Sequence, residues 1–97
     1  MRVELSQQVV DFIKRLPPEP RTRLRRALRE LARDKGDIEP LEAPLDGYCR
    51  LRVGGYRIIL SYTGRGRVQC VFAERRSIVY EVFALALQAA LSGEDRD

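Results

Sequence analysis

Apolar residues recur with a helical period in the first third of the chain. A first helix is predicted after Ser6, which is a suitable N-cap, and before Pro17-Pro18, which would end it. Its apolar face carries Val9, Val10, Ile13 and Leu16. A second helix is predicted from about Pro20 to Lys35, with Gly36 as its stop signal. Its stripe consists of Leu24, Ala27, Leu28, Leu31 and Ala32. Two amphipathic helices joined by prolines predict a helical hairpin.

Later runs of the chain have the alternation that is typical of strands. Three are predicted in succession, over Tyr48 to Val53, Tyr56 to Tyr62 and Arg67 to Ala73. A short strand around Arg2 to Leu5 could open the fold. The segment from Asp37 to Gly47 contains two prolines and is predicted to be a loop.

A third helix is predicted from Ser77 to about Leu91, followed by a charged tail, 92–97, that frays. At 97 residues the chain is expected to form a single domain, 1–97. The order of elements predicts an α+β fold in which an N-terminal helical hairpin packs on a small, mainly antiparallel twisted sheet. All helices are expected against one face of that sheet.

The stretch RLRVGGYRI indicates a tight hairpin, because paired glycines adopt the positive φ that two-residue turns need. The predicted register sets Arg52 opposite Arg57 and Val53 opposite Tyr56. Side chains alternate along a strand, so Arg50, Arg52 and Arg57 would share one face and leave the apolar face to the helices. Like charges directly opposite each other are destabilising. Such a pair is therefore either well solvated or used to hold an anion.

Net charge is +4 and the isoelectric point is about 9.5, which suits a polyanionic partner but is also ordinary for solubility. The chain has no histidine, and Cys49 and Cys70 lack metal-ligand spacing, so we expect no zinc site and no cofactor. Two reduced thiols fit a cytoplasmic protein. The amino terminus lacks the apolar core of a signal peptide, and no segment is expected to span a membrane.

Two further basic features could serve RNA. The second helix contains many arginines, which form either a solvated face or a nucleic-acid footprint. The candidate RNA- or ribosome-binding residues are Arg21, Arg25, Arg26, Arg29, Arg33 and Arg75. After the last strand, the stretch ERRSIVY places Arg76 and Tyr80 where a compact sheet could bring them near the arginine hairpin. Tyr80 alone could also be a half-buried aromatic at a helix start.

The order of these motifs resembles the RelE/ParE superfamily of toxins from bacterial and archaeal toxin–antitoxin systems. The likeness rests on a helical hairpin, on Gly55-Tyr56-Arg57 at a strand start, and on Arg76 four residues before Tyr80. It extends from the first strand into the last helix. For the RelE branch it implies a metal-independent, ribosome-dependent endoribonuclease that cuts messenger RNA and inhibits translation. Glu74 departs from the family, because the best-known members have a basic residue there, and the histidines of some relatives are missing.

The resemblance implies catalytic roles for Arg50, Arg52, Arg57, Arg76 and Tyr80. Cleavage by the ribose 2′-hydroxyl needs a proton acceptor, cations for the phosphorane and a donor for the leaving oxygen. In our hypothesis three arginines clamp the phosphate and Arg76 acts on the leaving-group side. Tyr80 is the base, since neighbouring guanidinium groups would favour its phenolate form. The fallback bases are Glu74 and Glu81.

Alternatives remain open at the sequence level. The ParE branch shares the fold and is associated with poisoning DNA gyrase, and a degenerate member would bind only antitoxin or nucleic acid. The resemblance implies a cognate antitoxin, in a hetero-oligomer, as well as the ribosome and messenger RNA as partners. The last helix is apolar almost all round, so it must be buried by its own domain, by that antitoxin or by a second copy of the chain.

Overall fold

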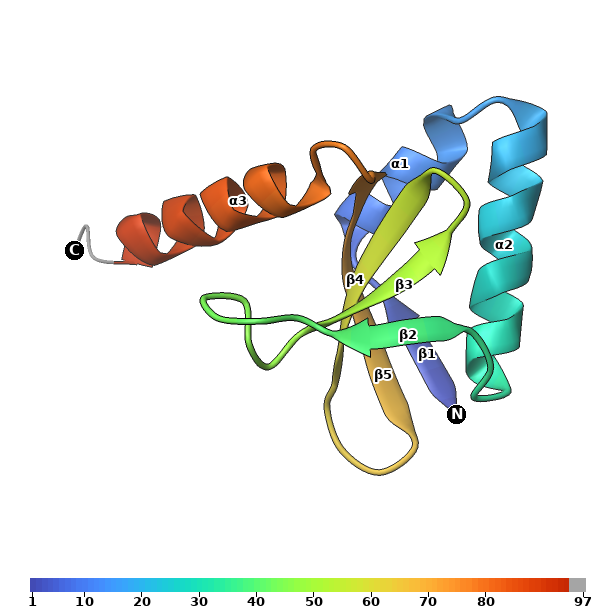
Figure 1. The fold of residues 1–97 in the computed structure, drawn as a ribbon, viewed down its shortest axis with the longest axis horizontal. Coiled ribbons are helices and arrows are strands. Elements are labelled where there is room, and N and C mark those ends of the chain that lie inside the picture. Colours follow the sequence, from blue (N-terminus) through green and yellow to red (C-terminus); the bar gives the residue numbers. More distant parts are fainter. Residues whose placement is uncertain (95–97) are drawn as a thin grey trace.

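The computed structural model of the protein describes residues 1–94 and contains one five-stranded mixed sheet with three helices. The strand order is β1-β5-β4-β3-β2, in which β1 runs parallel to β5 and all other neighbours are antiparallel (Figure 1). The strands are β1 (Arg2–Leu5), β2 (Asp37–Pro40), β3 (Cys49–Val53), β4 (Tyr56–Tyr62) and β5 (Arg67–Arg75). The α+β prediction is therefore confirmed.

Helices α1 (Gln7–Arg15) and α2 (Pro18–Ala32) cover one face of the sheet and form its main core. The Ser6 hydroxyl caps α1 as predicted, accepting a hydrogen bond of 3.2 Å from the Val9 amide. This core is built from side chains of both helices and the inward positions of the strands. Its fully buried members include Val9, Leu24, Leu31, Leu51, Ile58, Leu60, Val68 and Cys70. Burial raises the pKa of the Cys70 thiol to about 12, so this thiol stays protonated and unreactive at neutral pH.

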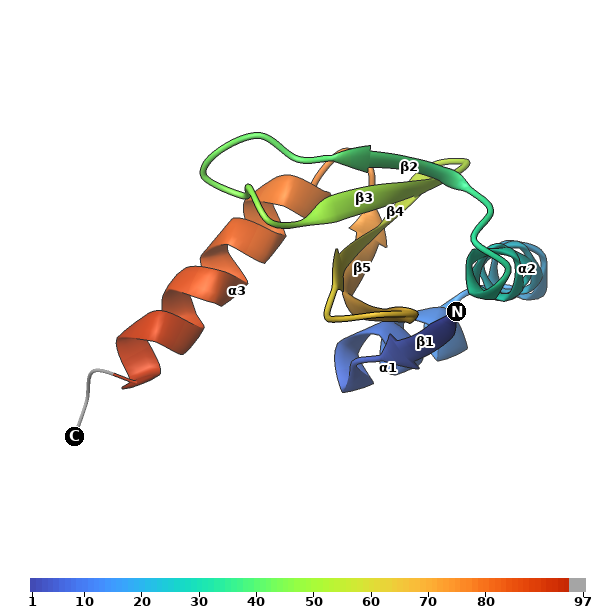
Figure 2. The same cartoon turned by 90° about the horizontal axis from the view of Figure 1, so that it is seen from below.

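Helix α3 (Val79–Glu94) lies on the other face, which corrects the prediction that all helices share one face. Its first turns place Val79 and Phe83 against Ile59 and Phe72, and the rest projects away from the sheet (Figure 2). The reason lies in β4, where Ile58, Ile59 and Leu60 are all fully buried. Consecutive apolar residues point to opposite faces, so Ile59 needs a cover of its own.

Other boundaries also differ from the predicted ones. The predicted opening strand is present as β1, so the helical pair is not strictly N-terminal. Asp37–Pro40, predicted as loop, is the edge strand β2, where Pro40 is tolerated because an edge strand has amides that need no partner. Helix α3 continues to Glu94, beyond its predicted end at about Leu91, and 95–97 lie outside the described residues. Among residues 1–94, no helix has the length and apolarity that crossing a bilayer requires.

Candidate functional site

The predicted hairpin register is the one observed. Arg52 pairs with Arg57 and Val53 with Tyr56 across the β3–β4 turn. Gly54 has a φ of +57°, which a glycine adopts without steric cost. By the alternation of strands, Arg50, Arg52 and Arg57 share the sheet face opposite to α1 and α2. We call this the arginine face.

Carboxylates flank the arginines on that face. The strand register aligns Asp37, Arg52, Arg57 and Glu74 in one row across four strands. The next row begins with Glu39 and Arg50. Because opposite charges on neighbouring strands attract, these acids offset the repulsion between Arg52 and Arg57. The arginine face is consequently balanced by three carboxylates and is not a uniformly positive patch.

Among the three arginines of this face, Arg50 forms the ion pairs. Its guanidinium contacts the Asp37 carboxylate at 3.2 Å and the Glu39 carboxylate at 2.9 Å, and donates to the Asp37 carbonyl at 3.0 Å. The side chain is only 14% exposed. Burial disfavours its charged form, but the hydrogen bond to Asp37 and the charges of Glu39 and Asp37 outweigh it and raise the pKa of Arg50. Arg50 is therefore held by the protein rather than open to a phosphate.

Arg52 and Arg57 are more accessible to an anion. Arg52 is exposed, and the half-buried Arg57 turns back to the hairpin, donating to the carbonyls of Gly54 at 2.9 Å and Tyr56 at 2.8 Å. Within residues 1–93 neither guanidinium forms an ion pair. These two side chains therefore carry the charge on the arginine face that a ligand could still engage.

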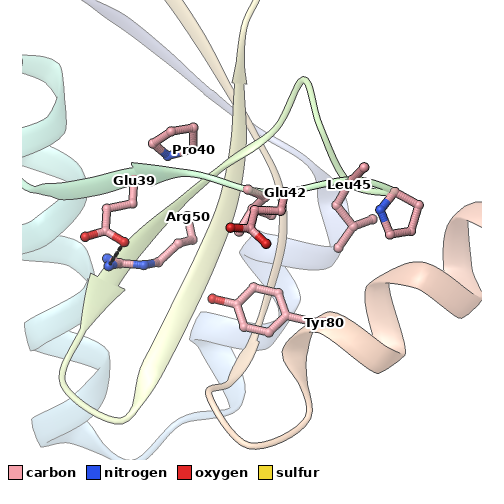
Figure 3. A pocket seen from close by; sticks show the side chains of 9 residues that line it. Glu39, Pro40, Glu42, Leu45, Arg50 and Tyr80 are labelled. Atoms are coloured by element: carbon pink, nitrogen blue, oxygen red, sulfur yellow. Dashed lines mark ion pairs between the residues drawn. The ribbon is translucent and has the colours of Figure 1, made fainter.

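Tyr80 lies in the first turn of α3 and borders a groove beside Arg50. The groove has a volume of about 400 Å³ and is lined by Glu39, Pro40, Leu41, Glu42, Ala43, Pro44, Leu45, Arg50 and Tyr80. Figure 3 shows the Tyr80 hydroxyl directed toward Arg50 and Glu39, with the Glu42 carboxylate across the opening. Of the arginines on the hairpin, Arg50 shares the lining of this groove with Tyr80.

The end of β5 approaches the hairpin turn, as expected from a compact sheet. The Arg76 amide donates to the Gly55 carbonyl at 2.9 Å, and the Arg76 side chain is exposed. Arg75 pairs with Tyr56, one position beyond the pair of Arg57 with Glu74. By alternation Arg75 therefore belongs to the opposite face from Arg57, and it does not join the arginine face.

The arginines of α2 form a separate basic surface. This helix packs on the face opposite to the arginine face, so most of its arginines lie apart from Arg52. Four of the five candidate residues are exposed and Arg21 is half-buried; the set is Arg21, Arg25, Arg26, Arg29 and Arg33. Arg23 comes nearest to the hairpin, because its guanidinium lies 2.8 Å from where a Cβ on Gly54 would stand.

Three acidic residues of the site were not predicted: Asp37, Glu39 and Glu42. Asp37 and Glu39 belong to β2 and fall on the arginine face because they alternate with Ile38. The signal was the alternation in DIEP, which the adjacent prolines obscured. Of the fallback bases, Glu74 accepts a hydrogen bond from the neighbouring Arg75 amide at 2.9 Å, and Glu81 is exposed on α3.

Comparison with solved structures defines the class of fold. No family model and no curated protein matches the sequence. The toxin–antitoxin complex RelBE2 from Mycobacterium tuberculosis contains a chain that aligns at a TM-score of 0.67 and 22% identity, covering 77% of this chain and 90% of that one. A chain of the RelB-RelE complex from Methanococcus jannaschii aligns at a TM-score of 0.64 and 22% identity, covering 82% of this chain and 98% of that one. A YoeB/ParE toxin from Agrobacterium tumefaciens aligns at a TM-score of 0.64 and 20% identity, covering 78% of this chain and 99% of that one.

These likenesses establish that the chain has the fold of RelE/ParE toxins. They span 90% or more of each solved chain and 77–82% of this one.

Proposed function

We propose that the protein is the toxin of a type II toxin–antitoxin system and acts as a metal-independent, ribosome-dependent messenger RNA endoribonuclease that inhibits translation. One observation carries the proposal. On a RelE/ParE fold, Arg52 and Arg57 share a sheet face with Arg50, which lines a groove together with Tyr80. The family resemblance places catalytic residues at these positions.

Arg52 and Arg57 would bind the scissile phosphate in the proposed reaction. They would stabilise the extra negative charge that develops when the ribose 2′-oxygen attacks phosphorus. Arg50, with its two carboxylate partners, would instead position Glu39 and the groove wall. Arg76 would act on the side of the departing 5′ oxygen, which must receive a proton as the phosphorus–oxygen bond breaks.

The groove offers two kinds of proton acceptor for the 2′-hydroxyl. Tyr80 is the base in our hypothesis from the sequence, with its hydroxyl directed into the groove. Glu39 and Glu42 supply carboxyl oxygens in the same groove as alternative acceptors. Tyr80→Phe and Glu39→Gln, compared in single-turnover cleavage on programmed ribosomes, would identify the acceptor by the larger loss of rate.

The balanced charge of the arginine face supports a requirement for the ribosome. A face with three arginines and three carboxylates attracts free RNA weakly, because phosphate neutralisation supplies most of such affinity. A ribosome that presents messenger RNA in a fixed orientation would supply several kcal/mol of the barrier through positioning.

A cognate antitoxin is the proposed protein partner, in a cytoplasmic hetero-oligomer. RelB-RelE and YoeB-YefM are described as complexes of antitoxin and toxin, and their toxin chains share this fold. The exposed apolar positions of α3, including Leu85 and Leu91, support a partner that covers them.

Induced expression in a bacterial host would test the proposed activity. Growth would be followed together with primer extension on a reporter messenger RNA, for wild type and for Arg57→Ala with Tyr80→Phe. Arg65→Ala is a matched control, because Arg65 is exposed in the β4–β5 turn and is not one of the proposed catalytic residues. We expect arrest with new RNA ends for wild type and control, and neither in the double variant. Arrest without new ends would indicate gyrase as the target.

A binding-only protein is the second candidate. The ion pairs of Arg50 and the position of Glu74 opposite Arg57 favour it, since both reduce the positive charge available to a phosphate. This candidate predicts no growth arrest and no cleavage on purified programmed ribosomes, together with retained binding to the antitoxin. Sedimentation of the toxin mixed with the antitoxin encoded beside it would measure that binding.

A further inference from the structure

A small apolar slot lies between α1, α2 and the end of β1, on the opposite side of the sheet from the arginine face. Its volume is about 120 Å³, and it is lined by Leu5, Val10, Ile13, Lys14, Arg25 and Leu28. Liquid water occupies about 30 Å³ per molecule, so the slot has room for about four heavy atoms. Four carbon atoms make up the side chain of leucine or isoleucine.

The floor of this slot is suited to an aliphatic group. Val10 and Leu28 are half-buried, Ile13 is buried, and Leu5 at the end of the edge strand is 39% exposed. Water in the slot would find few polar partners on such a floor, so an apolar side chain that displaced it would gain free energy.

The rim of the slot is positive. Lys14 and Arg25 are exposed, and neither forms an ion pair anywhere in the part of the chain that lies between residues 1 and 93. Asp11, one turn before Lys14, accepts a hydrogen bond from the Gln7 side chain at 2.9 Å. Arg21 and Arg29 lie one turn on either side of Arg25 and extend the positive rim along α2.

We propose that this slot is a docking site for a partner peptide segment in which one leucine or isoleucine is flanked by aspartate or glutamate. The aliphatic side chain would fill the slot, and the flanking carboxylates would pair with Lys14 and Arg25. Charge complementarity selects an acidic segment over a basic one. The apolar floor selects a peptide over RNA, because a phosphate would contact the rim alone and a nucleobase is larger than the slot.

Methyl and amide chemical-shift changes would test the proposed site in the full chain. The probe is a blocked synthetic peptide, Glu-Asp-Leu-Glu-Asp, and its partner control replaces leucine with serine at unchanged charge. We expect the leucine peptide to shift the methyl signals of Val10, Ile13 and Leu28, and to bind at least tenfold more tightly than the serine peptide.

Two charge-reversed variants separate the slot from the general basicity of the protein. Lys14→Glu with Arg25→Glu should weaken binding of the leucine peptide at least tenfold. Arg33→Glu with Arg65→Glu changes the net charge equally but leaves the slot lining intact. This variant should weaken binding of the leucine peptide by no more than about twofold. All four residues are exposed, so both variants should fold, which the dispersion of the same spectra verifies.

Three outcomes would overturn the site. Equal weakening by both variants would show attraction by overall charge, and unmoved Val10 and Leu28 methyls would show that the slot stays empty. An oligouridylate that shifts the same methyls and displaces the peptide would reassign the surface to nucleic acid. None of these results depends on RNA cleavage, so the site and the proposed ribonuclease can fail separately.

Discussion

Arg50 illustrates how a residue with the right type and position can still be committed elsewhere. Two carboxylates and a backbone carbonyl surround its guanidinium, and the side chain is largely withdrawn from solvent. Breaking such a pair leaves one partner without its counter-charge, which costs more than the pair contributes. A phosphate that engaged Arg50 would have to displace Asp37 or Glu39.

Removing the two carboxylates should therefore release Arg50 for RNA. We expect Asp37→Asn with Glu39→Gln to strengthen binding of single-stranded RNA several-fold at low salt. The slope of log affinity against log salt should steepen by about 0.7, the value for one additional phosphate contact. Fluorescence anisotropy at several salt concentrations measures both quantities.

A matched control for this prediction is Glu4→Gln with Asp46→Asn, which changes the net charge equally at positions with no ion pair in residues 1–93. An equal gain in the control would mean that overall charge, rather than the freed guanidinium, governs RNA binding.

The two glycines of the hairpin turn are expected to respond differently to substitution. Gly54 has a φ of +57°, and a Cβ added to it would lie 2.8 Å from the Arg23 guanidinium. A Cβ added to Gly55 would have no other side chain or distant backbone atom within 4 Å. Gly54→Ala should lower the free energy of unfolding by about 1–2 kcal/mol, the cost of a left-handed conformation for an L-residue. Gly55→Ala should leave it unchanged or raise it by up to about 1 kcal/mol.

Urea denaturation of both variants measures that difference directly. If the two alanines proved equally destabilising, the turn would have to differ in solution from the one described.

At this scale the sequence predicts positions better than partners. The pairing of Arg52 with Arg57 follows from the glycine pair and the alternation of strands, both of which are local. The ion pairs of Arg50 depend on Asp37 and Glu39, which come from a segment whose prolines indicated a loop. A strand that forms only by pairing along a sheet edge leaves little local signal.

Among the elements, α3 is attached by a small part of its length. Val79 and Phe83, in its first two turns, pack against the sheet. The Phe83 ring lies edge-on to the Tyr48 ring, with 5.0 Å between the ring centroids. Beyond them the helix exposes Leu85 and Leu91. The sequence correctly predicted a helix here. The side of the sheet on which it packs depends on Ile59, and no periodicity in the sequence indicates that Ile59 is buried on the outer face.

Anchorage by Phe83 can be measured against a neighbouring position. Phe83→Ala should lower the free energy of unfolding by about 3–5 kcal/mol, the usual cost of removing a buried aromatic ring. Leu85→Ala should change it by less than about 0.5 kcal/mol, because that side chain is 65% exposed. Urea denaturation gives both values, and similar losses in the two variants would mean that α3 is covered along its whole length.

On the scale of the whole molecule, charge is distributed unevenly along the longest dimension. Helix α2, with five arginines and two glutamates, stands at one end, and α3, which has no lysine or arginine, extends from the other (Figure 1). An approaching polyanion is therefore attracted mainly to the α2 end.

Reversing charge at the α2 end should slow association with ribosomes. We expect Arg26→Glu with Arg29→Glu to reduce the association rate at low salt at least tenfold, with the difference fading as ions screen the field. Stopped-flow mixing with labelled ribosomes measures the rate. Gln88→Glu with Ala89→Glu on α3 makes a smaller change at the far end and should have little effect; an equal loss would refute the directional approach.

The attachment of α3 has a mechanical consequence. The helix is about 24 Å long at 1.5 Å per residue, its first turn carries Tyr80 at the groove, and its later turns expose Leu85 and Leu91. If α3 moved as one continuous helix about Phe83, a displacement at Leu91 would shift Tyr80 relative to Arg50. A partner bound to the distal turns would then change the shape of the groove without contacting it.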